Sequence, residues 1–264
     1  LRDWDVSINY GIKTGFNDAF IVTTQKRDEI LASCRTDEER EKTSNIIRPI
    51  LRGRDIKRYS YEWADLWLIA TFPSMHYDIE QYPAIKEHLL SFGMERLEQT
   101  GKEYVVDGQH IKARKKTNNK WFETQDSISY VDFLSQHKIV WKRVGSILRF
   151  SYDENQFLTL DSTCFAVGKN IEYICCVLNS SMGHYLLKDA PQTGTGDLLI
   201  SVQAIEPLRL PIISEEDDSL FIGWLNQLIL SQDGTSLEQV VLNKIFDLYG
   251  LTPVEREFIK TNFS

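Results

Sequence analysis

The sequence has little cysteine and no long apolar run, and each of these absences excludes a class of protein. The four cysteines form no Cys-x-x-Cys pair and have no zinc-ligand spacing with the five histidines. We therefore predict free thiols in the reducing environment of a cytoplasm. No apolar run reaches the length that a membrane-spanning helix needs, so the sequence predicts no membrane partner.

The motifs that cradle phosphates or present common nucleophiles are also absent. The chain contains no G-x-x-x-x-G-K, G-x-G-x-x-G or G-x-S-x-G motif. A metal-dependent nuclease needs clustered carboxylates. The nearest set, Glu255, Glu257 and Lys260, lies on a predicted helix where surface charge is expected. The sequence therefore predicts no catalytic residue, no metal ligand and no cofactor-binding residue in this chain.

The chain begins at Leu1 with neither an initiator Met nor a signal peptide, so we interpret it as a segment of a longer protein. Its 264 residues suffice to bury a sizeable core. We predict a main domain over residues 1–212. Residues 213–264 have helical periodicity and predict a C-terminal helical hairpin, packed on this domain or on a part of the protein outside this chain.

Charge is distributed unevenly along the sequence. The formal net charge is −8, and residues 213–264 hold nine acids and three bases, a net of −6, which leaves −2 for residues 1–212. Within that first part the bases cluster at Lys42–Arg58 (six bases, one acid), Lys112–Lys120 (five bases, no acid) and Lys138–Arg149 (four bases, no acid). Charge runs are commonly just solvated faces. Three basic clusters on an acidic chain nevertheless indicate one face that binds a polyanion.

The residue pattern predicts a mixture of short strands and helices, with antiparallel or irregular β structure and no βαβ succession. Four short strands are predicted over residues 139–144, 147–152, 157–160 and 163–167, and their close spacing favours antiparallel pairing. Further predicted strands cover residues 66–72, 198–202 and 208–213, and residues 8–23 are predicted to be extended. Helices are predicted over residues 28–33, 83–99, 174–188 and 219–230, with two more that Ser236 and Thr252 cap.

Several segments resemble one family, the TaqI-like C-terminal specificity domain of DNA adenine methyltransferases and fused restriction–methylation enzymes. Residues 10–20, YGIKTGFNDAF, resemble its opening signature, and residues 47–59, IRPILRGRDIKRY, resemble a second one. Weaker matches follow in chain order at residues 82–89, 121–123, 138–140, 177–180 and 247–252. Each motif is modest by itself, but seven in order along one chain make the resemblance specific.

The resemblance implies an α+β fold with an irregular, twisted β core, inserted helices and a C-terminal helical hairpin, and the strand and helix pattern is compatible with it. It also implies sequence-specific binding of double-stranded DNA, with the target adenine placed for a methyltransferase domain in the same polypeptide. S-adenosylmethionine is then expected in that catalytic domain. This chain has neither the glycine-rich cofactor loop nor the Asn/Asp-Pro-Pro-Tyr/Phe loop of an amino-methyltransferase, and it contains no Pro-Pro at all. We therefore expect neither methyl transfer nor DNA cleavage from this chain.

Candidate DNA-binding residues come from the basic clusters and the projecting loops. Lysine and arginine contact phosphates, whereas arginine, asparagine and glutamine contact base edges efficiently. The candidates are Lys13, Thr14, Arg52, Arg54, Lys57, Arg58, Lys112, Arg114, Lys115, Lys116, Asn118, Asn119, Lys120, Lys142, Arg143, Gln192 and Thr193. Arg114, Asn118, Asn119, Arg143 and Gln192 are the candidates for base contacts.

Structural roles compete with these functional ones. Arg54 and Asp55 could form a buried ion pair that fixes their loop, and residues 192–196 could be a surface loop without a function. A second possible function is binding of a partner protein through the acidic surface, as a regulatory module of a phage-defence methyltransferase. The DNA hypothesis requires the scattered cations, Arg54, Lys115 and Arg143 among them, to converge on one face.

Overall fold

The computed structural model describes residues 1, 4–231 and 235–263, and the chain divides into two compact units. Unit 1 comprises residues 1–11, 52–62 and 135–264, and unit 2 comprises residues 12–51 and 63–134. The division predicted at residue 212 lies inside unit 1 and stays a prediction. None of the described helices has the length and apolar character needed to cross a membrane.

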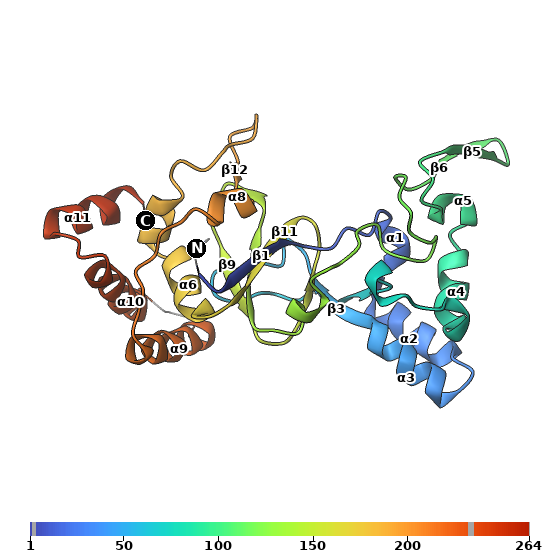
Figure 1. Cartoon of the computed structure of the whole chain (residues 1–264), viewed down its shortest axis with the longest axis horizontal. Coiled ribbons are helices and arrows are strands. Elements are labelled where there is room, and N and C mark those ends of the chain that lie inside the picture. Colours follow the sequence, from blue (N-terminus) through green and yellow to red (C-terminus); the bar gives the residue numbers. More distant parts are fainter. Residues whose placement is uncertain (2–3, 232–234, 264) are drawn as a thin grey trace. The chain divides into compact units, whose positions relative to one another are not determined.

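Unit 1 joins small antiparallel sheets to helices (Figure 1). Its strands are β1 (Val6–Tyr10), β7 (Lys138–Lys142), β8 (Val144–Gly145), β9 (Phe150–Asp153), β10 (Leu158–Thr159), β11 (Thr163–Gly168) and β12 (Leu198–Leu199). Its helices are α6 (Ile171–Leu178), α7 (Ser181–Leu186), α8 (Val202–Ile205), α9 (Glu215–Leu230), α10 (Thr235–Leu248) and α11 (Pro253–Asn262).

The main sheet of unit 1 has the order β1-β11-β7-β9, and its three pairs of neighbouring strands are antiparallel. Trp141 in β7 lies in register with Cys164 of β11 and Phe150 of β9. Residues that lie in register on neighbouring strands point to the same face of a sheet, so these three side chains form one row in the core. Helix α6 packs on this sheet, and α9 packs in turn on α6. The C-terminal helices are thus part of the core of unit 1.

A fully buried ion pair lies between two strands of this sheet. The Lys138 ammonium at the start of β7 lies 2.8 Å from the Asp153 carboxylate at the end of β9, and both side chains have no exposed surface. Asp153 also accepts the backbone N–H groups of Asn155 and Phe157. Removing two charges from water is costly unless each is paired and hydrogen-bonded, and these contacts meet that requirement.

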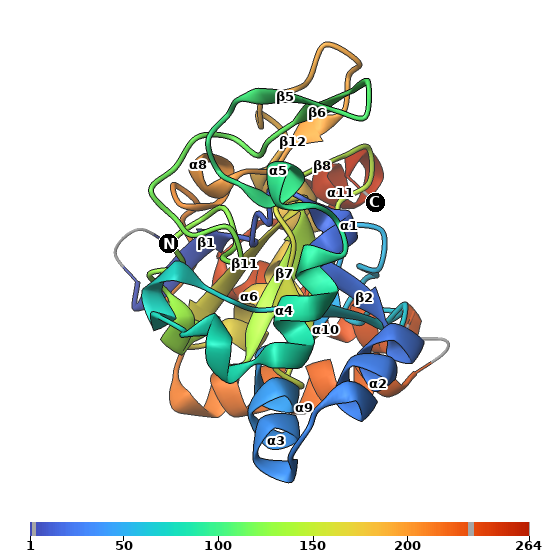
Figure 2. The same cartoon turned by 90° about the vertical axis from the view of Figure 1, so that its right-hand side faces the viewer.

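Unit 2 is a smaller assembly of helices around a short sheet (Figure 2). Its helices are α1 (Asn17–Phe20), α2 (Thr24–Ser33), α3 (Asp37–Ile46), η1 (Pro73–Met75), η2 (Ile79–Gln81), α4 (Pro83–Leu90), α5 (Met94–Leu97) and η3 (Val131–Phe133). Its strands are β2 (Ile21–Thr23), β3 (Ile47–Leu51), β4 (Leu66–Ile69), β5 (Glu103–Val106) and β6 (Gln109–Lys112).

Local sequence explains most of unit 2. Strand β4 pairs antiparallel with both β2 and β3, and the central residues Leu68 and Ile69 of its apolar run are buried. Thr23 and Thr36 cap α2 and α3 through their side chains. Strands β5 and β6 form a hairpin whose turn residues, Asp107 and Gly108, both have positive φ, as a two-residue hairpin turn requires.

Much of the predicted architecture is confirmed. The fold is α+β, and the strands predicted between residues 139 and 167 form. Among them, β7 pairs antiparallel with both β9 and β11. Pro83 opens α4, and Thr252 and Glu255 form the predicted capping box of α11. All four cysteines are free thiols, and all are buried.

Three local predictions for unit 1 are wrong. The helix predicted over residues 174–188 is two helices, because the Asn179 side chain bonds to the backbone of Phe150 and Ser180 caps α7. The strand predicted over residues 208–213 does not form. The strand predicted over residues 198–202 forms only at Leu198–Leu199, and Val202 begins α8.

Two predicted helix starts and one extended segment are also wrong. Ser236 lies inside α10 and does not cap it, and α9 begins at Glu215 after the capping residue Ser214. The segment predicted to be extended over residues 8–23 is interrupted by α1, since Thr14 bonds to Asn17 and forms a turn there. Short polar side chains thus compete with extended pairing.

Replacing Lys138 with Met is expected to lower the free energy of unfolding by about 3–5 kcal/mol, because the Asp153 charge is left buried without its partner. Denaturant unfolding measures the loss. The matched control is Lys188→Met, which breaks an exposed ion pair with Asp189 and is expected to change stability by less than about 1 kcal/mol. Equal small losses in both variants would contradict the structural role of the buried pair.

Candidate functional site

Basic side chains of unit 1 surround a small surface hollow of about 180 Å³, called here the Arg54 hollow. Three of its lining residues carry a positive charge, and none of the described lining residues is acidic. The lining residues are Gly53, Arg54, Ile56, Lys142, Gly145, Ser146, Ile147 and Arg149. Such a surface is complementary to an anion.

The segment of residues 52–62 is anchored on the edge strand β9. Tyr59 donates its backbone N–H to the Phe150 carbonyl and accepts the Tyr152 N–H, both at 3.0 Å. Tyr59 is buried and has a left-handed backbone, with φ of 64°. These two bonds occupy part of the free edge of the sheet and fix where the segment's basic side chains lie.

Asp55 determines which arginine of this segment is free. Its buried carboxylate accepts the Arg52 backbone N–H at 2.8 Å and two guanidinium bonds from Arg52, at 3.0 and 2.8 Å. The hydrogen bonds with Asp55 raise the pKa of Arg52. The sequence left open an ion pair between Arg54 and Asp55, and this possibility is wrong, because Asp55 pairs with Arg52. Arg54 itself is exposed and forms no ion pair within the described part of the chain.

Two glycines leave space for the Lys142 side chain, which lines the hollow. A Cβ on Gly53 would lie 3.0 Å from Cγ of Lys142, and one on Gly145 would lie 3.5 Å from Cδ of the same side chain. The Lys142 stem therefore runs between two backbone segments without side chains. Arg149, just before β9, completes the set of cations. Lys142 and Arg149 are both exposed, and no acidic group among the described residues pairs with either.

Other candidates in unit 1 have partners. Lys57 forms an ion pair with Glu62 at 3.0 Å. Arg58 pairs with Glu238 at 2.9 Å and also donates to the Asn179 carbonyl. Arg143 lies 5.8 Å from the centre of the Tyr10 ring, a long cation–π contact.

The loop that carries Gln192 and Thr193 is a structured turn. Gln192 is exposed and bridges to Leu198, and the Thr193 hydroxyl lies 2.9 Å from that of Thr195. The Thr193 N–H bonds to the Asp197 carbonyl at 2.8 Å. The loop therefore presents Gln192 on a defined backbone, and its role in DNA binding stays a prediction.

The candidates in unit 2 divide into exposed and buried groups. Lys13, Lys112, Lys115, Lys116, Asn118 and Lys120 are exposed. Thr14 is fully buried, and its hydroxyl donates to Asn17 at 2.6 Å. The Asn119 amide donates to the carbonyls of Thr124 and Gln125. Thr14 and Asn119 thus stabilise the local backbone.

Arg114 belongs to the framework of unit 2, in contrast to its predicted place among the base contacts. It is 3% exposed, and its guanidinium donates to the carbonyls of Thr14, Leu97, Trp121 and Glu123. Burial lowers the pKa of Arg114 to about 10, so the side chain remains charged at neutral pH. These four carbonyls come from three separate segments, at residues 14, 97 and 121–123, and one side chain holds them together.

Two basic residues of the cluster at residues 138–149 have other roles in the structure than the sequence indicated. Lys138 was counted there as surface charge, but it is buried against Asp153. Arg149 was counted in the cluster and was not among the candidates, yet it lines the Arg54 hollow. Its position directly before an apolar strand was the available signal. The convergence expected for Arg54, Lys115 and Arg143 involves both units and stays a prediction.

A family model described as the TaqI-like C-terminal specificity domain matches residues 48–212. No curated protein matches the chain. The fold is similar to that of the type IIL restriction-modification enzyme MmeI, solved in complex with DNA, with a TM-score of 0.63 and 12% identity over 97% of this chain and 35% of that one. The type IIG restriction endonuclease BpuSI has a TM-score of 0.49 and 12% identity, covering 92% of this chain and 30% of that one. The chain thus spans about a third of the length of these enzymes.

Replacing Arg114 with Lys is expected to lower the free energy of unfolding by about 3 kcal/mol, because one ammonium group cannot satisfy four separate buried carbonyls. Thermal unfolding and amide hydrogen exchange of unit 2 measure the loss. Lys115→Gln, in the neighbouring exposed residue, is the control and is expected to change stability by less than about 0.5 kcal/mol. If the Arg114→Lys variant is as stable as the wild type, Arg114 does not stabilise the framework of unit 2.

Proposed function

The chain belongs to the family of TaqI-like C-terminal specificity domains, and we propose that it binds duplex DNA and recognises its target sequence. The observation that carries this proposal is the Arg54 hollow, where three exposed cations gather, with no acidic residue among its described lining, on a chain of net charge −8. An anionic protein that concentrates positive charge at one place fits a polyanionic ligand.

The chemistry of the exposed groups suggests a division of labour. Lys142 and the lysines at 112, 115, 116 and 120 are suited to phosphates, because a flexible ammonium group attracts anions without demanding a fixed geometry. Arg54 and Arg149 present planar guanidinium groups, which can bind either a phosphate or the O6 and N7 atoms of guanine. Asn118 and Gln192 are the exposed amides suited to adenine.

We assign the reaction to the part of the protein outside this chain. The MmeI structure covers almost all of this chain with about a third of its own length, which leaves room for catalytic domains. We propose that the parent enzyme methylates adenine, and that this chain places the target for base flipping by the methyltransferase domain. S-adenosylmethionine would bind in that domain. Endonuclease activity of the parent fits the same similarity.

Binding of a partner protein is the second candidate function. Helix α11 exposes Val254 and Phe258 beside a shallow, mainly apolar hollow of about 460 Å³. Exposed apolar patches mark contact surfaces. DNA titration of the purified chain separates the two candidates, because only the DNA function predicts salt-dependent binding that depends on Arg54 and Lys142.

Replacing Arg54 and Lys142 with Gln is expected to weaken binding to a random-sequence DNA duplex by about tenfold or more. The slope of log affinity against log salt should fall by about two, since each lost phosphate contact removes about 0.9. Fluorescence anisotropy at several salt concentrations measures both quantities. The charge-matched control is Lys169→Gln with Arg209→Gln, two exposed residues of unit 1 that do not line the hollow. Equal effects of the two double substitutions would show that binding depends on net charge and not on the Arg54 hollow.

Replacing Lys115 and Lys116 with Ala is expected to weaken DNA binding and to lower the same slope by up to about two. The control is Lys26→Ala with Lys42→Ala, two lysines of unit 2 that already form ion pairs on their own helices. A slope that stays at its wild-type value in the Lys115/Lys116 variant would place this loop outside the DNA footprint.

A further inference from the structure

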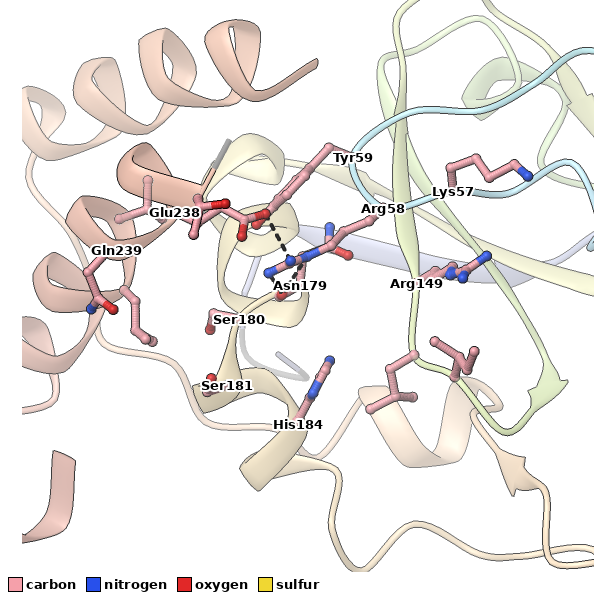
Figure 3. Close-up of a pocket in the computed structure, with 15 residues that line it drawn as sticks. Lys57, Arg58, Tyr59, Arg149, Asn179, Ser180, Ser181, His184, Glu238 and Gln239 are labelled. Carbon is pink, nitrogen blue, oxygen red and sulfur yellow. Dashed lines mark hydrogen bonds and ion pairs between the residues drawn. The ribbon is translucent and has the colours of Figure 1, made fainter. Parts of the chain in front are cut away.

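A second, larger hollow of about 860 Å³ adjoins the first in unit 1 and is called here the Arg58 hollow (Figure 3). Its walls come from the segment of residues 52–62, from residues 147–149, from the α6–α7 turn and from α10. Ile147 and Arg149 line both hollows. The positive surface of the Arg54 hollow therefore continues, through Arg149, toward the C-terminal helices.

Arg58 is held rigidly at the centre of this hollow. Its Nε and Nη2 atoms donate to the Asn179 carbonyl at 3.2 and 2.8 Å. Asn179 is itself fixed, because its side chain accepts the Phe150 N–H at 3.0 Å and donates to the Phe150 carbonyl at 2.6 Å. The remaining Nη1 atom lies 2.9 Å from a carboxylate oxygen of Glu238 on α10, as Figure 3 shows.

The charges around this hollow are unequal. Lys57, Arg58 and Arg149 carry positive charge, and Glu238 is the acidic residue among the described residues that line it. Lys57 already has a partner in Glu62. His184 faces the same space, and burial together with the nearby positive charge of Arg58 lowers its pKa, so its ring is neutral at neutral pH. The Glu238 carboxylate thus occupies a position that suits an anion.

We infer that Arg58 and Arg149 bind a second phosphate group of the DNA backbone, and that Glu238 masks this position in the free protein. The inference rests on the proposed function and extends it to α10, a helix that was not among the candidate DNA-binding segments. The Arg58–Glu238 pair is half exposed, with 45% and 27% of the two side chains accessible. A pair of this kind is weak and is screened by salt, so a phosphate can displace the carboxylate.

The masking predicts that removing the Glu238 charge strengthens DNA binding. Glu238→Gln is expected to raise affinity for a random-sequence duplex about two- to fivefold, the range of a weak surface ion pair. The log–log salt slope should steepen by about one, because one more phosphate is neutralised. The charge-matched control is Glu257→Gln, an exposed acid of α11 that lines neither of these hollows and should leave the slope unchanged.

Two further variants test whether the gain passes through the named cations. In the Glu238→Gln background, Arg58→Gln should return the slope to its wild-type value. Arg149→Gln also removes a cation of the Arg54 hollow, so it should return the slope to that value or lower it further. Arg58→Gln also removes the Arg58–Asn179 bonds, and thermal unfolding shows whether that variant still folds. If it does not fold, the Arg149→Gln variant decides the test.

The outcomes separate this inference from the proposed function. Equal affinity and slope in Glu238→Gln and Glu257→Gln, with Arg54 and Lys142 still required for binding, would overturn the masking and leave DNA binding intact. Absence of any salt-dependent DNA binding by the wild-type chain would overturn both.

Discussion

The backbone pairing of Tyr59 with β9 is the constraint on which the basic surface of unit 1 depends. It places a segment of eleven residues, 52–62, on a sheet whose strands come from residues 6–10 and from residues 138–168. Arg54 and Arg58 lie on this segment, whereas Lys142 and Arg149 lie at the ends of strands β7 and β9. Two backbone bonds therefore bring together cations that are almost a hundred positions apart in sequence. Without them the two basic clusters would be independent surface charges.

The structure separates cations that hold the protein together from cations that face outward. Lys138, Arg52 and Arg114 each have buried carboxylate or carbonyl partners. Arg54, Lys142 and Arg149 have no acidic partner among the described residues and share one hollow. The physical difference is desolvation, since a buried charge must satisfy its donors within the protein and an outward one is satisfied by water. Outward cations can exchange that water for phosphate oxygens.

Sequence patterns predicted those features that depend on near neighbours. The strands between residues 139 and 167 follow from short apolar segments at close spacing, and the cap of α11 follows from Thr252 and Glu255, three positions apart in one helical turn. The failures depend on distant partners. The segment at residues 208–213 has the composition of a strand, but its carbonyls accept hydroxyl groups from two tyrosines. Tyr249, just after α10, donates to Arg209, and Tyr173 on α6 donates to Pro211. Composition alone does not show which tyrosines will reach a segment.

The same limit applies to the candidate site. Arg114 lies in the most basic stretch of the sequence, and its burial depends on carbonyls at residues 14, 97, 121 and 123. The Arg52–Asp55 pair spans one turn and was within reach of local reasoning, yet the choice between Arg52 and Arg54 depends on how the turn folds. A count of basic residues thus located the regions of interest, and only the fold assigned the individual side chains.

The acidic net charge of the chain affects its selectivity among DNA sequences. Phosphate contacts strengthen binding to every DNA sequence equally, whereas base contacts strengthen binding to the target alone. A carboxylate that competes for Arg58 weakens the first kind of binding without touching the second. Under the proposed function, Glu238 and the acidic α9 therefore raise the ratio of specific to nonspecific affinity, at the expense of total affinity. The net charge of −8 is in this sense compatible with DNA recognition, because a protein that must find one site among many gains from weak attachment to the rest.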